Sequence, residues 1–145
     1  MITIQDILKS LDPETLLALA DDSSQIQCEE LPLIIDGQAY EPQLLADTFL
    51  SVVDQSIENA VHEITSYTDS TNGFIHKLCV DIAIYNLFSR GQQEVPKIRQ
   101  TRYANAIDCL IKISTGEITT NIQGTNSVLY SAIPRSFTRD TMGTF

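Results

Sequence analysis

Apolar residues recur every three or four positions over most of this chain, which is the spacing of amphipathic helices. Residues 42–67 form the longest such run, and residues 74–88 form a second run that is apolar nearly all round. A third run, residues 95–113, has a narrower stripe made of Tyr103, Ile107, Leu110 and Ile113. We therefore expect an all-α fold, a small helical bundle of about five helices, with residues 74–88 as the central helix.

Two short helices are expected at the start of the chain. Thr3 followed by Asp6 is typical of a capping box, which indicates a helix over residues 4–11. Asp12 and Pro13 then supply an N-cap and a proline at the first helical position. At the other end of the pattern, Gly116 predicts the point where the last long helix stops.

Asp81 and Arg102 are the polar positions that relate the second and third runs. They lie at similar distances from the break at residues 90–93, so an antiparallel helix pair brings them level. A carboxylate on the apolar central helix needs such a partner. We expect an ion pair whose main role is to fix the register of the two helices.

Residues 25–42 lack the helical period. Leu33–Ile35, then Asp36-Gly37 and a second short segment ending at Tyr40, are typical of a β-hairpin with a tight turn. The alternative is an ordered loop that lies across the helices.

The composition changes after the helical region, so we divide the chain into a helical domain, residues 1–118, and an extended C-terminal arm, residues 119–145. The arm is rich in Ser, Thr, Asn and Gly but keeps isolated large apolar side chains, which a disordered tail usually lacks. It can pack on its own bundle, or it can become ordered on a neighbouring subunit or another partner; we favour the second.

The net charge and the composition argue against some classes of function. A net charge of −10 and an isoelectric point near 4.4 argue against a surface that grips nucleic acid. Hydrophobic residues make up 43% of the chain, but no uninterrupted apolar run is long enough to span a membrane. The N-terminus lacks the pattern of a secretory signal. We expect a protein made in a cytosol, without membrane contact.

No catalytic or metal-binding motif is found. Cys28, Cys79 and Cys109 form no ligand cluster and are interpreted as small core residues. His62 follows Glu58 by one helical turn, but the second histidine, His76, belongs to another predicted helix. We therefore expect no cofactor, no metal and no enzymatic activity.

Several segments resemble a family of small phage proteins typified by the head–tail joining protein of Mu-like phages. They are residues 3–11, 12–21, 79–88 and 102–118, and a terminal segment RSFTRDTMGTF. The residues of that segment that fit the family pattern are Arg135, Phe137, Thr138, Arg139, Asp140, Gly143 and Phe145. The chain departs from the family where an Arg-Tyr-x-x-Pro turn precedes the central helix, because residues 69–73 read DSTNG here.

The resemblance implies a virion structural protein, assembled in the bacterial cytoplasm, that connects head and tail. Such adaptors form rings of about twelve copies below the portal protein, above the stopper and tail proteins, and DNA passes through the lumen without specific binding. It further implies that the arm grips the portal. The residues expected to make this contact are Arg135, Phe137, Arg139, Asp140 and Phe145.

Two other interpretations stay open at this stage. The protein can be a stopper or tail-terminator ring of the same phage neck. It can also be a small cytosolic regulator whose tail folds onto one protein target.

Overall fold

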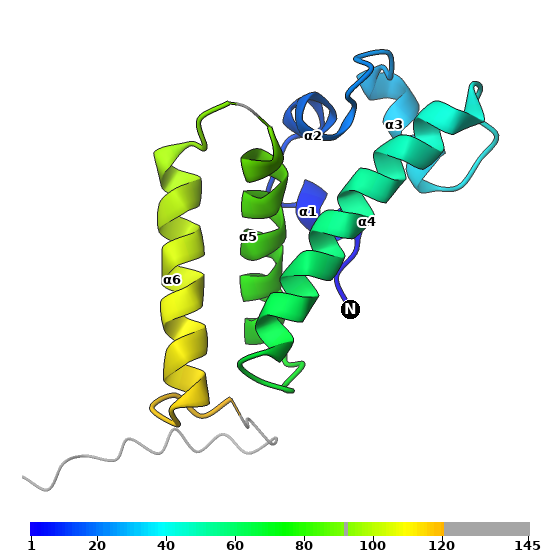
Figure 1. The fold of residues 1–145 in the computed structure, drawn as a ribbon. Coiled ribbons are helices and arrows are strands. Elements are labelled where there is room, and N and C mark those ends of the chain that lie inside the picture. Colours follow the sequence, from blue (N-terminus) through cyan, green and yellow to red (C-terminus); the bar gives the residue numbers. More distant parts are fainter. Residues whose placement is uncertain (92, 121–145) are drawn as a thin grey trace, which may run out of the picture.

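The computed structural model describes residues 1–91 and 93–120 of the 145-residue chain. Six α-helices and one short 3₁₀-helix make up this part, with no strand among the described residues, so the predicted all-α bundle is confirmed (Figure 1). The helices are α1 (Ile4–Leu8), α2 (Pro13–Ala20), η1 (Cys28–Glu30), α3 (Leu31–Ile35), α4 (Gln43–Thr65), α5 (Gly73–Arg90) and α6 (Lys97–Ser114).

Side-chain caps set the start of several helices. The Asp6 carboxylate accepts the backbone N–H of Thr3 at 3.0 Å, which completes the capping box predicted for α1. Asp12 accepts the N–H of Thr15 at 2.9 Å at the start of α2. Asn72 accepts the N–H groups of Phe74 and Ile75 at the start of α5. Each contact satisfies an N–H that has no partner inside its own helix.

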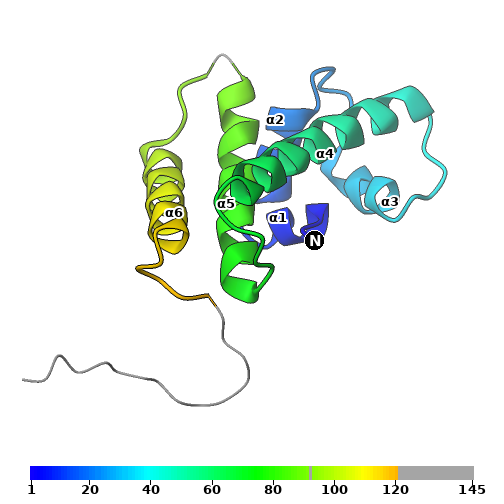
Figure 2. The same cartoon turned by 60° about the horizontal axis from the view of Figure 1, so that its bottom comes forward.

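Helix α5 is the centre of the bundle, as predicted. It contacts α1, α2, α4 and α6. In both views α6 stands along one side of α5, while α4 crosses α5 on the other side (Figures 1 and 2). Ile82, Ile84 and Leu87 of α5 are fully buried against Phe49 and Val53 of α4 and the short N-terminal helices.

The predicted hairpin at Leu33–Tyr40 is wrong. Leu33 and its neighbours belong to α3, which Pro32 can open because a proline is tolerated in the first turn of a helix. Gly37 has φ +69 and ends this helix: its N–H donates to Ile34 O at 3.2 Å, and the N–H of Gln38 donates to Leu33 O at 2.9 Å. This is a Schellman motif, so the Asp-Gly pair closes a helix instead of turning a hairpin.

The predicted glycine stop after α6 is confirmed by the same motif. Gly116 has φ +79, its N–H donates to Ile113 O at 3.1 Å, and the N–H of Glu117 donates to Lys112 O at 2.9 Å. Helix α6 therefore ends at Ser114, and the division of the chain at residue 118 stays a prediction. Of the predicted arm, residues 121–145 lie outside the described part of the chain.

Candidate docking surfaces

Asp81 and Arg102 meet at the register expected from the sequence. Arg102 Nη1 lies 3.8 Å from Asp81 Oδ1, which is within ion-pair range but too long for a hydrogen bond. The Asp81 side chain is 16% exposed and that of Arg102 is 47% exposed, so the pair lies at the edge of the α5–α6 contact. A solvent-accessible pair of this kind contributes about 1 kcal/mol or less. It assists the register of α6 and does not anchor the helix alone.

Arg99 attaches the start of α6 to the N-terminal part of the chain. Its Nη2 donates to Ser10 O at 2.9 Å, in the link between α1 and α2, and its Nη1 is buried without a hydrogen-bond partner among the described residues. Burial, together with the neighbouring Arg102, lowers the pKa of Arg99. Arg99 is therefore directed into the bundle and not onto an outer surface of α6.

Tyr103 joins α6 to both neighbouring long helices. Its ring stacks on that of Tyr85 in α5, with centroids 4.0 Å apart and planes 12° from parallel. Its hydroxyl donates to Glu63 Oε1 of α4 at 2.7 Å. The bond to this carboxylate and partial burial raise the pKa of Tyr103 to about 12. Tyr103 is the main polar contact between α6 and α4.

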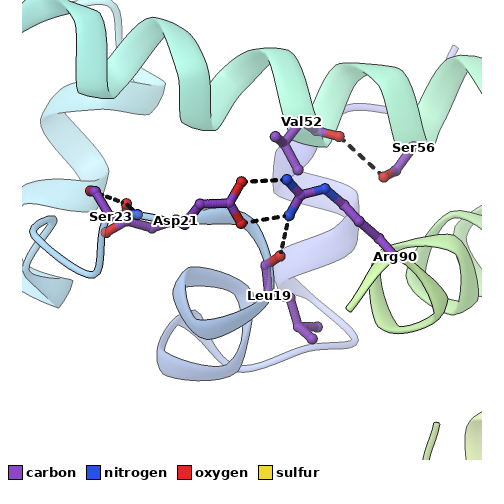
Figure 3. Close-up of polar contacts among 7 residues, drawn as sticks. Leu19, Asp21, Ser23, Val52, Ser56 and Arg90 are labelled. Atoms are coloured by element: carbon purple, nitrogen blue, oxygen red, sulfur yellow. Dashed lines mark hydrogen bonds and ion pairs between the residues drawn. The ribbon is translucent and has the colours of Figure 1, made fainter. Parts of the chain in front are cut away.

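Arg90, at the end of α5, binds the end of α2 (Figure 3). Its Nη1 donates to Asp22 Oδ1 at 2.9 Å and to Leu19 O at 3.0 Å, and its Nη2 donates to Asp22 Oδ2 at 2.5 Å. This bidentate contact lowers the pKa of Asp22 and raises that of Arg90. Two segments 68 residues apart in sequence are thereby held together.

The neighbouring Asp21 orders the loop after α2. It accepts hydrogen bonds from Ser23 N at 3.1 Å, from Ser23 Oγ at 2.5 Å and from Ile26 N at 2.9 Å, and the Ser23 contacts are drawn in Figure 3. Asp21 is only 7% exposed. Burial raises its pKa, but these hydrogen bonds together outweigh burial, so the pKa of Asp21 is lower than usual.

A polar hollow of about 510 Å³ lies between α4 and α5, next to Arg90. Hydroxyl and amide side chains dominate its lining, and no carboxylate, imidazole or thiol belongs to it. One of its hydroxyls, Ser56 Oγ, is already bonded to Val52 O at 3.1 Å (Figure 3). The lining can form hydrogen bonds with a polar chain but offers no general base to activate a nucleophile.

Comparison with known proteins decides the family of this chain. The profile of the family described as Bacteriophage Mu, Gp36 matches residues 2–133. The chain belongs to this family. No curated protein and no solved structure matches the chain.

Membership of the Mu Gp36 family makes the chain a phage protein and confirms the resemblance to Mu-like phage proteins. The match includes all six helices and continues into the predicted arm. It stops two residues before Arg135, so the segment RSFTRDTMGTF lies beyond it. The predicted portal-binding residues Arg135, Phe137, Arg139, Asp140 and Phe145 also lie outside the described residues and stay a prediction.

The described part of this Mu Gp36 family member holds no group of three His, Cys, Asp or Glu side chains that could bind a metal ion. None of its described helices is both long and apolar enough to cross a membrane. Cys79 is buried, and burial raises the pKa of its thiol to about 11. Cys28 and Cys109 are partly exposed, so the prediction that all three are core residues holds fully only for Cys79.

The sequence did not reveal two of the contacts that shape these surfaces. Arg90 and Asp22 are separated by most of the domain, and no short-range pattern pairs them. Tyr103 was assigned to the apolar stripe of its helix, whereas its hydroxyl reaches Glu63. A buried tyrosine usually finds a hydrogen-bond partner, which is the one available signal.

Proposed function

We propose that this protein is a head–tail connector of a Mu-like phage, an adaptor whose copies form a ring between portal and tail. The observation that carries the proposal is the match to the Mu Gp36 family over residues 2–133. It is supported by a small helical bundle and by the large apolar side chains in the sequence that follows it. In this proposal the protein is a virion component that has no catalytic role.

The bundle fixes the point from which the arm leaves. Asn72 caps α5 with its carbonyl oxygen, and its Nδ2 donates to Thr120 O at 2.6 Å. The last described residue is thereby attached to the end of the bundle where α5 begins. A ring of such bundles presents its arms from one level, which suits a contact with a single partner ring such as the portal protein.

The net charge of −10 suits a channel for DNA. Tight binding of DNA requires clustered Lys and Arg that replace counterions. A lumen with excess carboxylate repels the phosphate backbone, so DNA passes without being held. Ring closure with about twelve copies requires heterologous contacts between different faces of neighbouring subunits.

The test is the composition and structure of intact phage particles. We expect mass spectrometry of purified particles to detect the protein, and cryo-electron microscopy to place it in the neck beside the portal. Removal of the gene should give DNA-filled heads without tails. Absence of the protein from intact particles overturns the proposal and favours a cytosolic regulator. A position next to the tail tube overturns the adaptor role in favour of a tail terminator.

The role of the arm is tested by removing residues 121–145, which leaves every described residue in place. We expect the truncated chain to keep the helical circular-dichroism spectrum of the full chain and to lose binding to purified portal protein. A matched variant with Phe137→Ala and Phe145→Ala should weaken binding without loss of the arm. Full binding by the truncated chain would show that the bundle, and not the arm, contacts the portal.

A further inference from the structure

Helix α4 carries a strongly acidic outward face. The helix has four carboxylates and no Lys or Arg. Asp47, Asp54 and Glu58 line one shallow hollow on it, with no basic side chain in that lining. Asp54 and Glu58 are one turn apart, an arrangement that destabilises an isolated helix. Leu44, on the first turn of the same helix, is 74% exposed.

A basic face lies on the other side of α5, and we define it by Lys9, Lys77, Lys97, Ile98 and Arg102. Lys9, Lys77 and Arg102 line one hollow between α1, α5 and α6. Lys97 and Ile98 are the first two residues of α6, a helix that carries four basic side chains and one carboxylate. Ile98 is 61% exposed and lies one turn before Arg102. The hollow also holds Asp6 and Asp81, which pair with Lys9 and Arg102, so its three bases exceed its two carboxylates by one charge. The acidic face is thus wholly acidic and the basic face has a net positive charge, and each face carries one exposed aliphatic side chain.

We propose that the acidic face of α4 binds the basic face of a second copy of this chain. The two faces have opposite charge, which favours and orients their association. The part of α4 that carries the acidic face lies across α5 from α6 (Figures 1 and 2), and the Tyr103–Glu63 bond that joins α6 to α4 lies near the other end of α4. When two complementary surfaces lie on different sides of one molecule, they join its copies head to tail. Such a chain of copies closes into a ring when the rotation from one subunit to the next allows it.

This inference rests on the proposed ring and names the surfaces that join its subunits. The outward side of α6 supports it, because Lys97, Ile98 and Arg102 are exposed there, whereas the inward side packs on the core through Ala106, Leu110 and several partly buried side chains. Salt screens exposed charges over about 8 Å at physiological ionic strength, so the association should weaken as salt is added.

The test uses two charge-reversed variants of the full chain. Variant A carries Asp54→Lys and Glu58→Lys, and variant B carries Lys77→Glu and Lys97→Glu. All four side chains are exposed, and none has a side-chain hydrogen bond or ion pair among the described residues. We expect both variants to keep the helical spectrum of the wild type. Neither uses Arg102, whose loss would also disturb its contact with Asp81.

Sedimentation at low salt, between about 10 µM and 1 mM, covers the range in which weak interfaces assemble. The wild type should form species heavier than the 16.1 kDa monomer, and variants A and B alone should associate at least about tenfold more weakly. An equal mixture of A and B should associate again, because each reversed face then finds an opposite charge on the other variant.

A control variant with Glu14→Lys and Asp69→Lys makes the same change in net charge as variant A at exposed positions outside both faces. It should associate like the wild type. The inference is overturned if the wild type stays monomeric throughout, if the mixture associates no better than A or B alone, or if the control loses association as A does. Particle composition tests the connector function separately, because subunits joined through other faces would still be found in the virion.

Discussion

Helices α5 and α6 have the same length, 18 residues each, but they relate to the bundle in different ways. Eight residues of α5 are buried, against two of α6. Helix α5 is surrounded by α1, α2, α4 and α6, whereas α6 packs mainly on α5. The difference teaches that packing inside the fold constrains α5 on several sides and α6 mainly on one. The other side of α6 is largely exposed.

The two helices are also held by different forces. The position of α5 depends on apolar area buried on several sides, a contribution distributed over many side chains. The position of α6 depends on Ala106, Leu110 and several partly buried apolar side chains on one side, together with the polar contacts of Arg99 and Tyr103. Single substitutions should therefore have large effects in α5 and graded effects in α6.

The largest expected effect is that of Ile82→Ala in α5. Ile82 is fully buried, so removal of three carbon atoms leaves a cavity and lowers the free energy of unfolding by about 2–5 kcal/mol. Urea denaturation followed by circular dichroism measures it. The matched change Ile111→Ala in α6, where the side chain is 46% exposed, should cost about 0.5 kcal/mol or less. Equal losses would remove the distinction between the two helices.

Asp21→Ala comes next and probes a polar group on the densely packed side. The substitution leaves the N–H of Ile26 without its acceptor, so we expect a loss of about 1–3 kcal/mol. The pKa of Asp21 is lower in the folded chain than in the unfolded chain. Its contribution is therefore complete above about pH 4 and is lost as the pH falls below that value.

Urea titrations between pH 3 and pH 7 measure this contribution. The difference between wild type and Asp21→Ala should shrink toward the acid end of the range. Asp36→Ala, at an exposed carboxylate in the turn after α3, is the control and should show a much smaller difference. A pH-independent loss for Asp21→Ala would mean that packing, and not the ionised carboxylate, stabilises the loop.

Much of the fold could be predicted because the period of the apolar residues is a local property of the sequence. The three long helices and the central place of α5 follow from it, and the end of α6 follows from Gly116, because glycine adopts the left-handed conformation that ends a helix. The level positions of Asp81 and Arg102 follow from one further assumption, that the two helices form an antiparallel pair.

Other features could not be predicted, because identical local chemistry serves two structures. An Asp-Gly pair suits both a hairpin turn and the end of a helix, and only the contacts around α3 decide between them. The pairing of Arg90 with Asp22 depends on how distant helices pack, which no local pattern contains. The opposed charges of α4 and α6 were visible in the sequence, but their separation on two sides of α5 was not.

Tyr103→Phe tests the polar attachment of α6. The ring can still stack on Tyr85, so only the hydroxyl bond to Glu63 is lost, and we expect a loss of about 1 kcal/mol. The folded pKa is about 12, against about 10 in the unfolded chain. The hydroxyl bond therefore contributes fully to stability below about pH 10, and its contribution is lost as the pH rises through about 12. Absorbance titration should show one late-ionising tyrosine fewer in the variant; an unchanged titration would assign that ionisation elsewhere.

The smallest effect on stability should come from Ile98→Ala, although we expect it to change assembly. Ile98 is 61% exposed on the first turn of α6, so its loss should change the free energy of unfolding by no more than about 0.5 kcal/mol. The same change removes the exposed aliphatic side chain of the basic face and should weaken self-association, measured by sedimentation at low salt. Leu33→Ala on α3, 40% exposed and outside both faces, is the control. If Ile98→Ala lowers stability as much as a core substitution, α6 is anchored by this residue and its outward side is not free for a neighbour.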